Sequence, residues 1–253
     1  MVGHIIVTDE ESTRTIVMRR PEKKNALSEE MFLELHDAVV SAQSSPEIRC
    51  LILTGRSGVF TAGDDVEDFL TLATGKYDPT KTRNSVLFLQ ALVNNRKPLI
   101  AAVDGIAVGM GATMVFHCDY VIASTTASFS SPFVQYGLVP EGASSLLLPR
   151  MAGHQRAFAM LVMGRSISAE EGREAGFVNV VVPPGHTMNE AKKVAREICE
   201  LPADAVDVAR KLLKLPKEDI LRRIGQEEHL FGERRRSPGV VAALKSFLSR
   251  KRK

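Results

Sequence analysis

The stretch LIAAVDGIAVGMGAT, residues 99–113, passes directly from an apolar run into a segment rich in glycine. Its first five residues carry no polar side chain, which is typical of a strand buried on both faces of a parallel sheet. We expect residues 104–113 to turn and then open a helix that runs to about Cys118. Small residues at such a turn let the backbone approach a ligand, and a helix start presents free N–H groups. The stretch therefore predicts an α/β protein with a candidate ligand-binding turn.

A second turn of the same kind follows the apolar strand that ends at Thr54. It reads FTAGDDV, residues 60–66. Two such turns facing each other would offer backbone N–H groups to a negatively charged oxygen. Glycine spacing alone leaves a tight packing turn without a ligand equally open. It does not complete the dinucleotide fingerprint GxGxxG, because Met114 stands where the third glycine belongs.

Apolar runs bounded by turn residues predict further strands, and helical spacing of apolar residues predicts the helices. We expect one helix to be capped by Ser28 and ended by Pro46. A short helix should begin at the capping box of residues 168–171 and end at Gly176. The further predicted strands are residues 5–7, 15–18, 50–53, 120–123 and 177–182.

The chain changes character after the Pro-Pro-Gly segment of residues 183–185, because the pattern beyond it is helical throughout. A soft boundary falls at residues 190–195. We therefore divide the chain into a core of residues 1–193 and a C-terminal helical region of residues 194–253. The apolar stripe of residues 240–248 is compatible both with a subunit interface and with packing on the chain's own core.

Composition is that of an ordinary globular protein, with 44% hydrophobic and 25% charged residues and a formal net charge of +3. We expect no membrane span, no secretory signal and a cytoplasmic location. The three cysteines are far apart and in no CxxC pattern, so we expect neither a disulfide framework nor a zinc site. Residues 234–236 and 250–253 are basic clusters, which we interpret as solvated surface. Contact with a phosphorylated ligand or nucleic acid is the alternative, and charge alone does not choose between them.

Other catalytic patterns fit poorly. Residues 142–146 lack the second glycine of a GxSxG nucleophile elbow. His117, Cys118 and Asp119 are adjacent, so a helix would direct them to different faces, and we expect core packing rather than metal ligation.

Five segments in order resemble the crotonase, or enoyl-CoA hydratase/isomerase, superfamily. They are residues 20–27, 60–66, 104–113, 118–123 and 164–183. The resemblance implies an α/β fold with a spiral crotonase-like core of ββα units and a C-terminal helical trimerisation region. It also implies an acyl-CoA substrate, no separate cofactor or metal, and a homotrimer or dimer of trimers.

The resemblance also implies what the two turns do. The backbone N–H groups of Asp64 and Met110 fall where the family holds the thioester oxygen of the substrate. Such donors stabilise an enolate more than the neutral substrate. The implied contacts to the substrate and its coenzyme A are Lys24, Ala26, Ala62, Gly63, Asp64, Asp65, Val66, Gly109 and Met110, with Lys24 near the phosphates.

Hydratases of this family carry two glutamates, and the matching positions here are Thr113 and Phe133. Neither side chain can exchange the protons that activate water. A lone glutamate, Glu141, stands in a Pro-Glu-Gly turn instead. On the bare sequence it reads as a solvated turn residue. The segment of residues 131–145, however, is similar to Δ3,Δ2-enoyl-CoA isomerases of the peroxisomal type, and this favours Glu141 as the catalytic base.

A single carboxylate suits a double-bond shift, because one group can take a proton from C2 and return one to C4. Phe133, Tyr136 and Leu138 are expected to form the acyl pocket, and with Val139 to keep Glu141 dry and raise its pKa. The alternatives are hydration, thioester hydrolysis, or a non-catalytic acyl-CoA-binding or RNA-binding relative. We expect no nucleic-acid partner.

Overall fold

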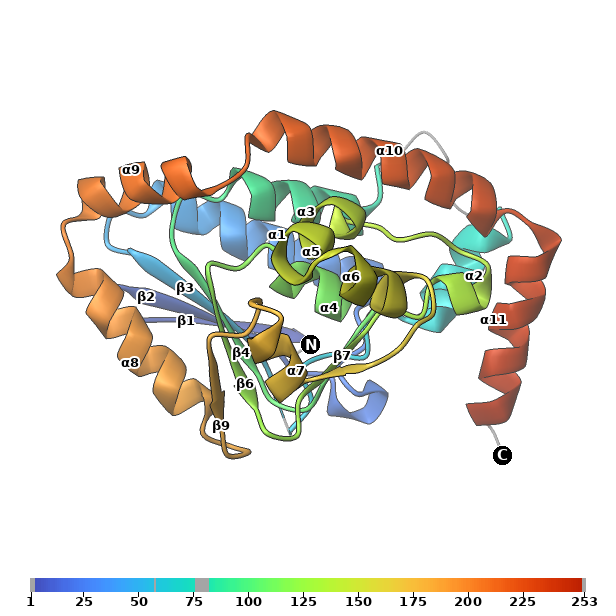
Figure 1. The fold of residues 1–253 in the computed structure, drawn as a ribbon, viewed down its shortest axis with the longest axis horizontal. Coiled ribbons are helices and arrows are strands. Elements are labelled where there is room, and N and C mark those ends of the chain that lie inside the picture. Colours follow the sequence, from blue (N-terminus) through green and yellow to red (C-terminus); the bar gives the residue numbers. More distant parts are fainter. Residues whose placement is uncertain (1–2, 57, 76–81, 252–253) are drawn as a thin grey trace.

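A six-stranded sheet forms the centre of the molecule in the computed structural model, which describes residues 3–56, 58–75 and 82–251 (Figure 1). The N-terminal strands pair antiparallel, and each later neighbour is parallel, as the apolar runs predicted. The strands, in sheet order, are β1 (Ile5–Glu10), β2 (Thr13–Met18), β3 (Cys50–Gly55), β4 (Leu99–Val103), β6 (Tyr120–Ser124) and β9 (Val180–Val182).

A second, three-stranded sheet continues the spiral beside the first. It consists of β5 (Ile106–Val108), β7 (Ser128–Ser130) and β8 (Ile167–Ser168), in that order. β5 follows β4 after only two residues, and Gly105 between them has a positive φ of 76°. A Cβ at Gly105 would lie 2.0 Å from the carbonyl oxygen of Gly58, so glycine is required for the chain to turn here.

Helices cover both faces of the six-stranded sheet at its centre, because β3, β4 and β6 are buried on both sides. Odd-numbered residues of β3 and β4, such as Leu53 and Leu99, join the core beneath α1 (Glu29–Ser44) and α3 (Asn84–Asn94). Even-numbered residues, such as Ile52 and Ile100, pack with α8 (Thr187–Glu200) on the opposite face. The two-residue period of a strand thus supplies two separate cores from one apolar run.

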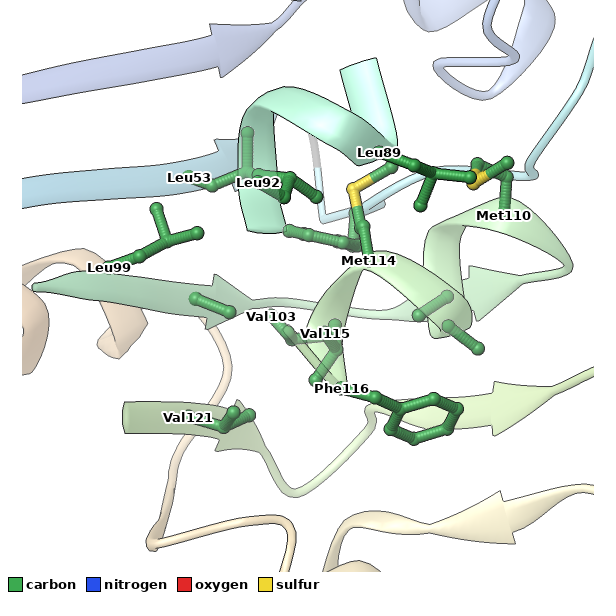
Figure 2. Close-up of a cluster of buried hydrophobic side chains, with 14 of the residues drawn as sticks. Leu53, Leu89, Leu92, Leu99, Val103, Met110, Met114, Val115, Phe116 and Val121 are labelled. Carbon is green, nitrogen blue, oxygen red and sulfur yellow. The ribbon is translucent and has the colours of Figure 1, made fainter. Parts of the chain in front are cut away.

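A short helix, α4 (Met110–Val115), starts directly after the glycine segment and is buried along its whole length. Met110 and Met114 extend toward Leu89 on α3, within the larger core cluster (Figure 2). α4 is shorter than predicted, because the chain tightens into a turn at residues 116–118. β9 is also shorter than the predicted strand, since Phe177 leaves the strand direction to pack edge-on against Phe116 and Phe129.

The helix caps predicted at Ser28 and at residues 168–171 are both present. Ser28 accepts a hydrogen bond from the N–H of Met31, and Ser168 and Glu171 form the predicted capping box. The structure adds elements that no sequence pattern predicted. These elements are the three strands of the second sheet, the short turns η1 (Pro21–Lys23) and η2 (Val134–Tyr136), and the helices α2 (Val66–Ala73), α3, α5 (Ser144–Ala152) and α6 (His154–Leu161). The predicted short helix is α7 (Ala169–Glu174).

Beyond β9 the chain is helical, as predicted, and continues from α8 into α9 (Ala203–Leu213), α10 (Lys217–Arg235) and α11 (Pro238–Lys251). α10 crosses over α3, and α11 packs beside α2 (Figure 1). Val240 and Leu244 of the predicted apolar stripe are buried against the chain's own Phe69 and Phe133. Side chains of the terminal basic cluster, residues 250–253, lie outside the described part of the structure. No described helix has the length and apolar composition needed to cross a membrane.

Asn25 holds the early loop against the first glycine turn. It is fully buried, with a left-handed φ of 54°. Its Nδ2 donates to the carbonyl oxygens of Arg56 (3.0 Å) and Val59 (2.7 Å), and its Oδ1 accepts from the N–H of Arg20 (2.8 Å). One side chain therefore satisfies backbone groups from two loops that are far apart in sequence.

Asn25→Ala should lower the free energy of unfolding by about 2–4 kcal/mol, because buried backbone groups lose their partners and alanine is strained at this φ. Urea denaturation measures the change. Asn94→Ala is the matched control: this exposed asparagine at the end of α3 donates to the carbonyl oxygen of Gln90, so the free energy should change by about 0.5 kcal/mol or less. Equal effects of the two substitutions would contradict the role given to Asn25.

Candidate active site

Backbone hydrogen bonds join the early loop to the first glycine turn. The N–H of Ala62 donates to the oxygen of Lys24 (3.0 Å), and the N–H of Leu27 donates to the oxygen of Gly63 (2.8 Å). The N–H of Asp65 in turn donates to the oxygen of Leu27 (2.8 Å). The two segments that the sequence predicted to bind the same ligand therefore run side by side.

The first glycine turn also pairs with the start of the second. Thr61 exchanges backbone hydrogen bonds with Ile106 (3.0 Å) and Val108 (3.1 Å). Gly63 has φ +82°, and a Cβ at this position would lie 2.4 Å from the oxygen of Val108 and 3.6 Å from the nitrogen of Met110. Only glycine permits this approach, which brings the two predicted turns together.

The backbone N–H groups of Asp64 and Met110 lie on these adjoining turns. Met110 is the first residue of α4, so its N–H has no intrahelical partner. Within the described residues, neither N–H donates a hydrogen bond to another backbone carbonyl. Gly109, which precedes Met110, donates to the oxygen of Ser130 (2.8 Å) and has φ +56°. The predicted pair of donors is thus placed on neighbouring turns, with the Met110 side chain directed into the core.

The other predicted coenzyme A contacts differ in exposure. Lys24 is exposed at φ 52°, Ala26 is buried, and Ala62 and Val66 are partly buried. The Asp65 carboxylate is already engaged, because it caps α2 through the N–H of Glu67 (3.0 Å) and pairs with Arg20 (2.8 Å). That side chain therefore holds the turn in shape, and the Asp65 N–H is likewise engaged, with Leu27.

Glu141 is buried, with 2% of its surface exposed, and not solvated as the bare sequence suggested. Its turn packs against the start of α4: a Cβ at Gly142, which has φ +67°, would lie 2.5 Å from Cγ2 of Thr113. The Glu141 Oε2 accepts a hydrogen bond from Nη2 of Arg83 (2.9 Å). Its Oε1 is buried with no hydrogen-bond partner among the described residues. One oxygen is therefore fixed and the other is free.

Arg83 is a site residue that sequence reasoning missed. It immediately precedes α3, is 3% exposed, and lies 5.0 Å from the centre of the Phe231 ring. Its guanidinium also donates to Glu228 of α10, from Nε (3.1 Å) and Nη2 (2.7 Å). Glu141 and Glu228 follow Arg83 by 58 and 145 positions in sequence, so no local pattern signals the cluster.

A second missed residue, Glu227, supports the Glu141 turn from α10. Its carboxylate accepts hydrogen bonds from the N–H groups of Ala143 (2.5 Å) and Ser145 (3.1 Å), and from the Ser145 hydroxyl. Ala143 has φ 60°, a conformation that alanine rarely adopts. The buried carboxylate therefore stabilises the strained turn that carries Glu141.

Burial raises the pKa of Glu141 to about 8, and the nearby charge of Asp64 adds to the increase while Arg83 opposes it. Burial likewise raises the pKa of Asp64 to about 6, with Arg83 again opposing. Burial also opposes the charge on Arg83, but Glu141 and Glu228 outweigh it, so its pKa is raised and it stays protonated. Glu141 is therefore a stronger base than an ordinary glutamate, and Arg83 stabilises its ionised form.

The predicted acyl-pocket residues also come together. Phe133 and Leu138 are buried in an apolar cluster with Phe231, and Tyr136 packs against it. The Phe133 ring would lie 3.5 Å from a Cβ at Gly109, so this cluster adjoins the second glycine turn. Two cavities lie elsewhere on the described chain, one of them about 990 Å³ and lined in part by α9 and α10, and neither is lined by a predicted site residue.

The positions that would carry the two hydratase glutamates are both buried. Thr113 lies beneath the Glu141 turn, and its Oγ1 has no partner among the described residues. Phe133 packs edge-on against Phe231, with ring centres 5.9 Å apart. The carboxylates near Glu141 instead come from the first turn, as Asp64, and from α10, as Glu228.

A family model described as "Enoyl-CoA hydratase/isomerase" matches residues 8–252 of the chain. The chain belongs to this family, also called the crotonase family. A solved enoyl-CoA hydratase/isomerase from Pseudoalteromonas atlantica T6c superposes with a TM-score of 0.92 at 32% identity, covering 98% of each chain. The predicted crotonase fold, with its C-terminal helices, is therefore confirmed.

Among curated proteins, the chain is 31% identical to human enoyl-CoA delta isomerase 2 over 98% of its own length and 64% of the human protein. It is 32% identical to the 1,2-epoxyphenylacetyl-CoA isomerase of Escherichia coli K12, over 87% of its length and 86% of that protein. The chain thus spans about two thirds of the human relative and most of the bacterial one.

Glu227→Ala should destabilise the protein by about 2–4 kcal/mol, because the buried N–H groups of Ala143 and Ser145 lose their acceptor. Chemical denaturation monitored by circular dichroism measures the loss. Glu233→Ala on the same helix is the matched control, since its carboxylate is exposed and only pairs with His229 at 3.6 Å; it should change stability by about 0.5 kcal/mol or less. If Glu227→Ala leaves the free energy of unfolding unchanged, the Glu141 turn does not depend on Glu227 for its stability.

Proposed function

We propose that this crotonase-family chain is an acyl-CoA enzyme that interconverts 3-enoyl-CoA and trans-2-enoyl-CoA, with Glu141 as its proton carrier. The observation that carries the proposal is the Glu141 carboxylate: it is buried, it is held by Arg83 through Oε2, and its Oε1 has no hydrogen-bond partner in the described part of the chain. A free oxygen on an otherwise fixed carboxylate suits a group that must give and take a proton.

The reaction would proceed in two proton transfers. Glu141 Oε1 removes a proton from C2, and the electrons of that C–H bond form an enolate whose charge resides on the thioester oxygen. The N–H groups of Asp64 and Met110 donate to that oxygen. Glu141 then returns the proton to C4 as the C3–C4 double bond moves to C2–C3. One backbone donor of this kind typically contributes about 3–4 kcal/mol to transition-state stabilisation.

The raised pKa of Glu141 supports this role, because a stronger base removes a carbon-bound proton more readily. Hydration of a double bond would instead need two groups that activate water, and Thr113 and Phe133 occupy their positions. The likeness to human enoyl-CoA delta isomerase 2, over 98% of this chain and 64% of that protein, also favours isomerisation. The resemblance of residues 131–145 supports the peroxisomal-type subgroup.

The coenzyme A portion would lie along the joined backbone of the early loop and the first glycine turn, with the exposed Lys24 near its phosphates. The acyl chain would pass the apolar cluster that contains Phe133, Tyr136 and Leu138. We also propose assembly as trimers through the C-terminal helices, since Leu212 and Leu213 at the end of α9 are 82% and 87% exposed. Sedimentation measurements test that assembly.

Glu141→Gln should lower kcat for isomerisation of 3-hexenoyl-CoA by about 10²–10⁴, because the amide cannot accept the proton. The assay follows double-bond migration and deuterium incorporation in deuterated water, with hydration of crotonyl-CoA measured in parallel. Glu174→Gln, an exposed glutamate on α7, is the control and should retain full activity. Full isomerase activity in Glu141→Gln, or hydration faster than isomerisation in the wild type, would overturn the proposal.

The pH dependence of kcat/KM should follow the protonation of Glu141. Its pKa is raised to about 8, and only the ionised form is a base. Below this pKa the protonated fraction dominates, so kcat/KM should rise about tenfold per pH unit and level off above about pH 8. A profile that is flat between pH 6 and 9 would contradict a buried carboxylate base.

A further inference from the structure

Arg83 joins three parts of the fold at one buried guanidinium. The residue precedes α3, Glu228 lies on α10, and Glu141 lies in the turn before α5. An arginine this deeply buried is retained only where its hydrogen bonds are satisfied by fixed acceptors. The site therefore contains an ionic cluster of defined geometry behind the proposed proton carrier, on the side of Oε2 rather than Oε1.

The two carboxylates share one nitrogen of that guanidinium, Nη2, which has an N–H for each. Nη2 donates both to Glu141 (2.9 Å) and to Glu228 (2.7 Å), and only Glu228 receives a second bond, from Nε at 3.1 Å. Glu228 thus has the bidentate contact, including the shortest of the three bonds, and this contact fixes the orientation of Arg83. Glu141 has the single, longer contact, which leaves its carboxylate oriented but less completely neutralised.

We propose that Arg83 and Glu228 form a positioning pair for the double-bond shift, in which Arg83 holds Oε2 of Glu141 and Glu228 limits the positive charge that Arg83 presents to it. The inference rests on the proposed function of Glu141. It adds two positioning residues, neither of which contacts the reacting carbons, and it explains why a base beside an arginine can remain a strong base.

Other charged residues near Arg83 and Glu228 also contribute to the electrostatic field at the Glu141 carboxylate. Asp64 faces Glu141 from the first glycine turn, and its charge adds to that of Glu228. Arg235, two turns after Glu228 on α10, faces the same cluster, and its Nε and Nη1 are buried without a partner among the described residues. Glu227 accepts its hydrogen bonds from Ala143 and Ser145, which follow Glu141 in the chain. Removing Arg83 or Glu228 therefore shifts the field at Glu141 in opposite directions.

The sign of each shift follows from electrostatics. The positive charge of Arg83 stabilises ionised Glu141, so Arg83→Met should raise the pKa of Glu141 and move the acid limb of kcat/KM to higher pH. The negative charge of Glu228 destabilises ionised Glu141, so Glu228→Gln should lower that pKa and move the limb to lower pH. Arg83→Lys keeps the charge but not the two-nitrogen geometry, and should fall between the wild type and Arg83→Met.

The experiment compares pH profiles of isomerisation for wild type, Arg83→Lys, Arg83→Met and Glu228→Gln as full-length proteins. We expect the acid limb to move up by at least one pH unit in Arg83→Met and down by at least half a unit in Glu228→Gln. At pH 7, kcat should fall at least tenfold in Arg83→Met, with KM changed less than threefold. The exposed pair Arg222 and Asp219, also on α10, supplies the control double variant Arg222→Met/Asp219→Asn, whose limb should not move.

The outcomes separate this inference from the function on which it rests. Activity losses with an unmoved acid limb would assign Arg83 and Glu228 a merely structural role and overturn the positioning pair. If Arg83→Met does not fold, the isosteric Glu228→Gln still decides, because a limb that stays or moves upward contradicts the inference. Retained activity in Glu141→Gln would overturn the proposed function itself, whatever the other profiles show.

Discussion

A buried ion pair between Arg83 and Glu141 is the interaction around which the site is organised. Burying a carboxylate costs several kcal/mol unless a fixed partner compensates it. Arg83 supplies that partner, and its own burial is compensated by Glu228 and by the face of the Phe231 ring. The position of α10 over α3 is therefore tied to the charge balance at Glu141. This dependence gives the C-terminal helical region a direct part in the site.

The backbone of three loops places the N–H groups that the proposed reaction uses. Because Gly63 has no side chain, the first turn can approach Val108, and the N–H groups of Asp64 and Met110 come to lie on adjoining turns. Asn25 fixes the early loop against the same turn through its side-chain hydrogen bonds. Backbone geometry thus positions the two proposed donors. Methionine fits at position 110 because its side chain packs in the core, while its N–H, at the start of α4, has no intrahelical partner.

Much of the fold could be predicted from local pattern. β4 has the predicted bounds, β3 and β6 differ from theirs by two residues or fewer, and the Ser28 cap and the capping box at Ser168 are present. Local pattern failed where packing determines the chain direction, as at Phe177, which packs against Phe116 instead of extending the strand. It also missed α3, whose apolar residues surround the helix too evenly to give a clear stripe.

The sequence by itself determined the strands, the glycine turns and the presence of a glutamate in a Pro-Glu-Gly turn, because these depend on neighbours within a few residues. Only the tertiary structure decided that this glutamate is buried, that Arg83 binds one of its oxygens, and that Asp64 raises its pKa further. Charges act through space, and the residues that tune Glu141 are separated from it by tens of positions along the chain. Their effect exists only once the helices and turns have packed together.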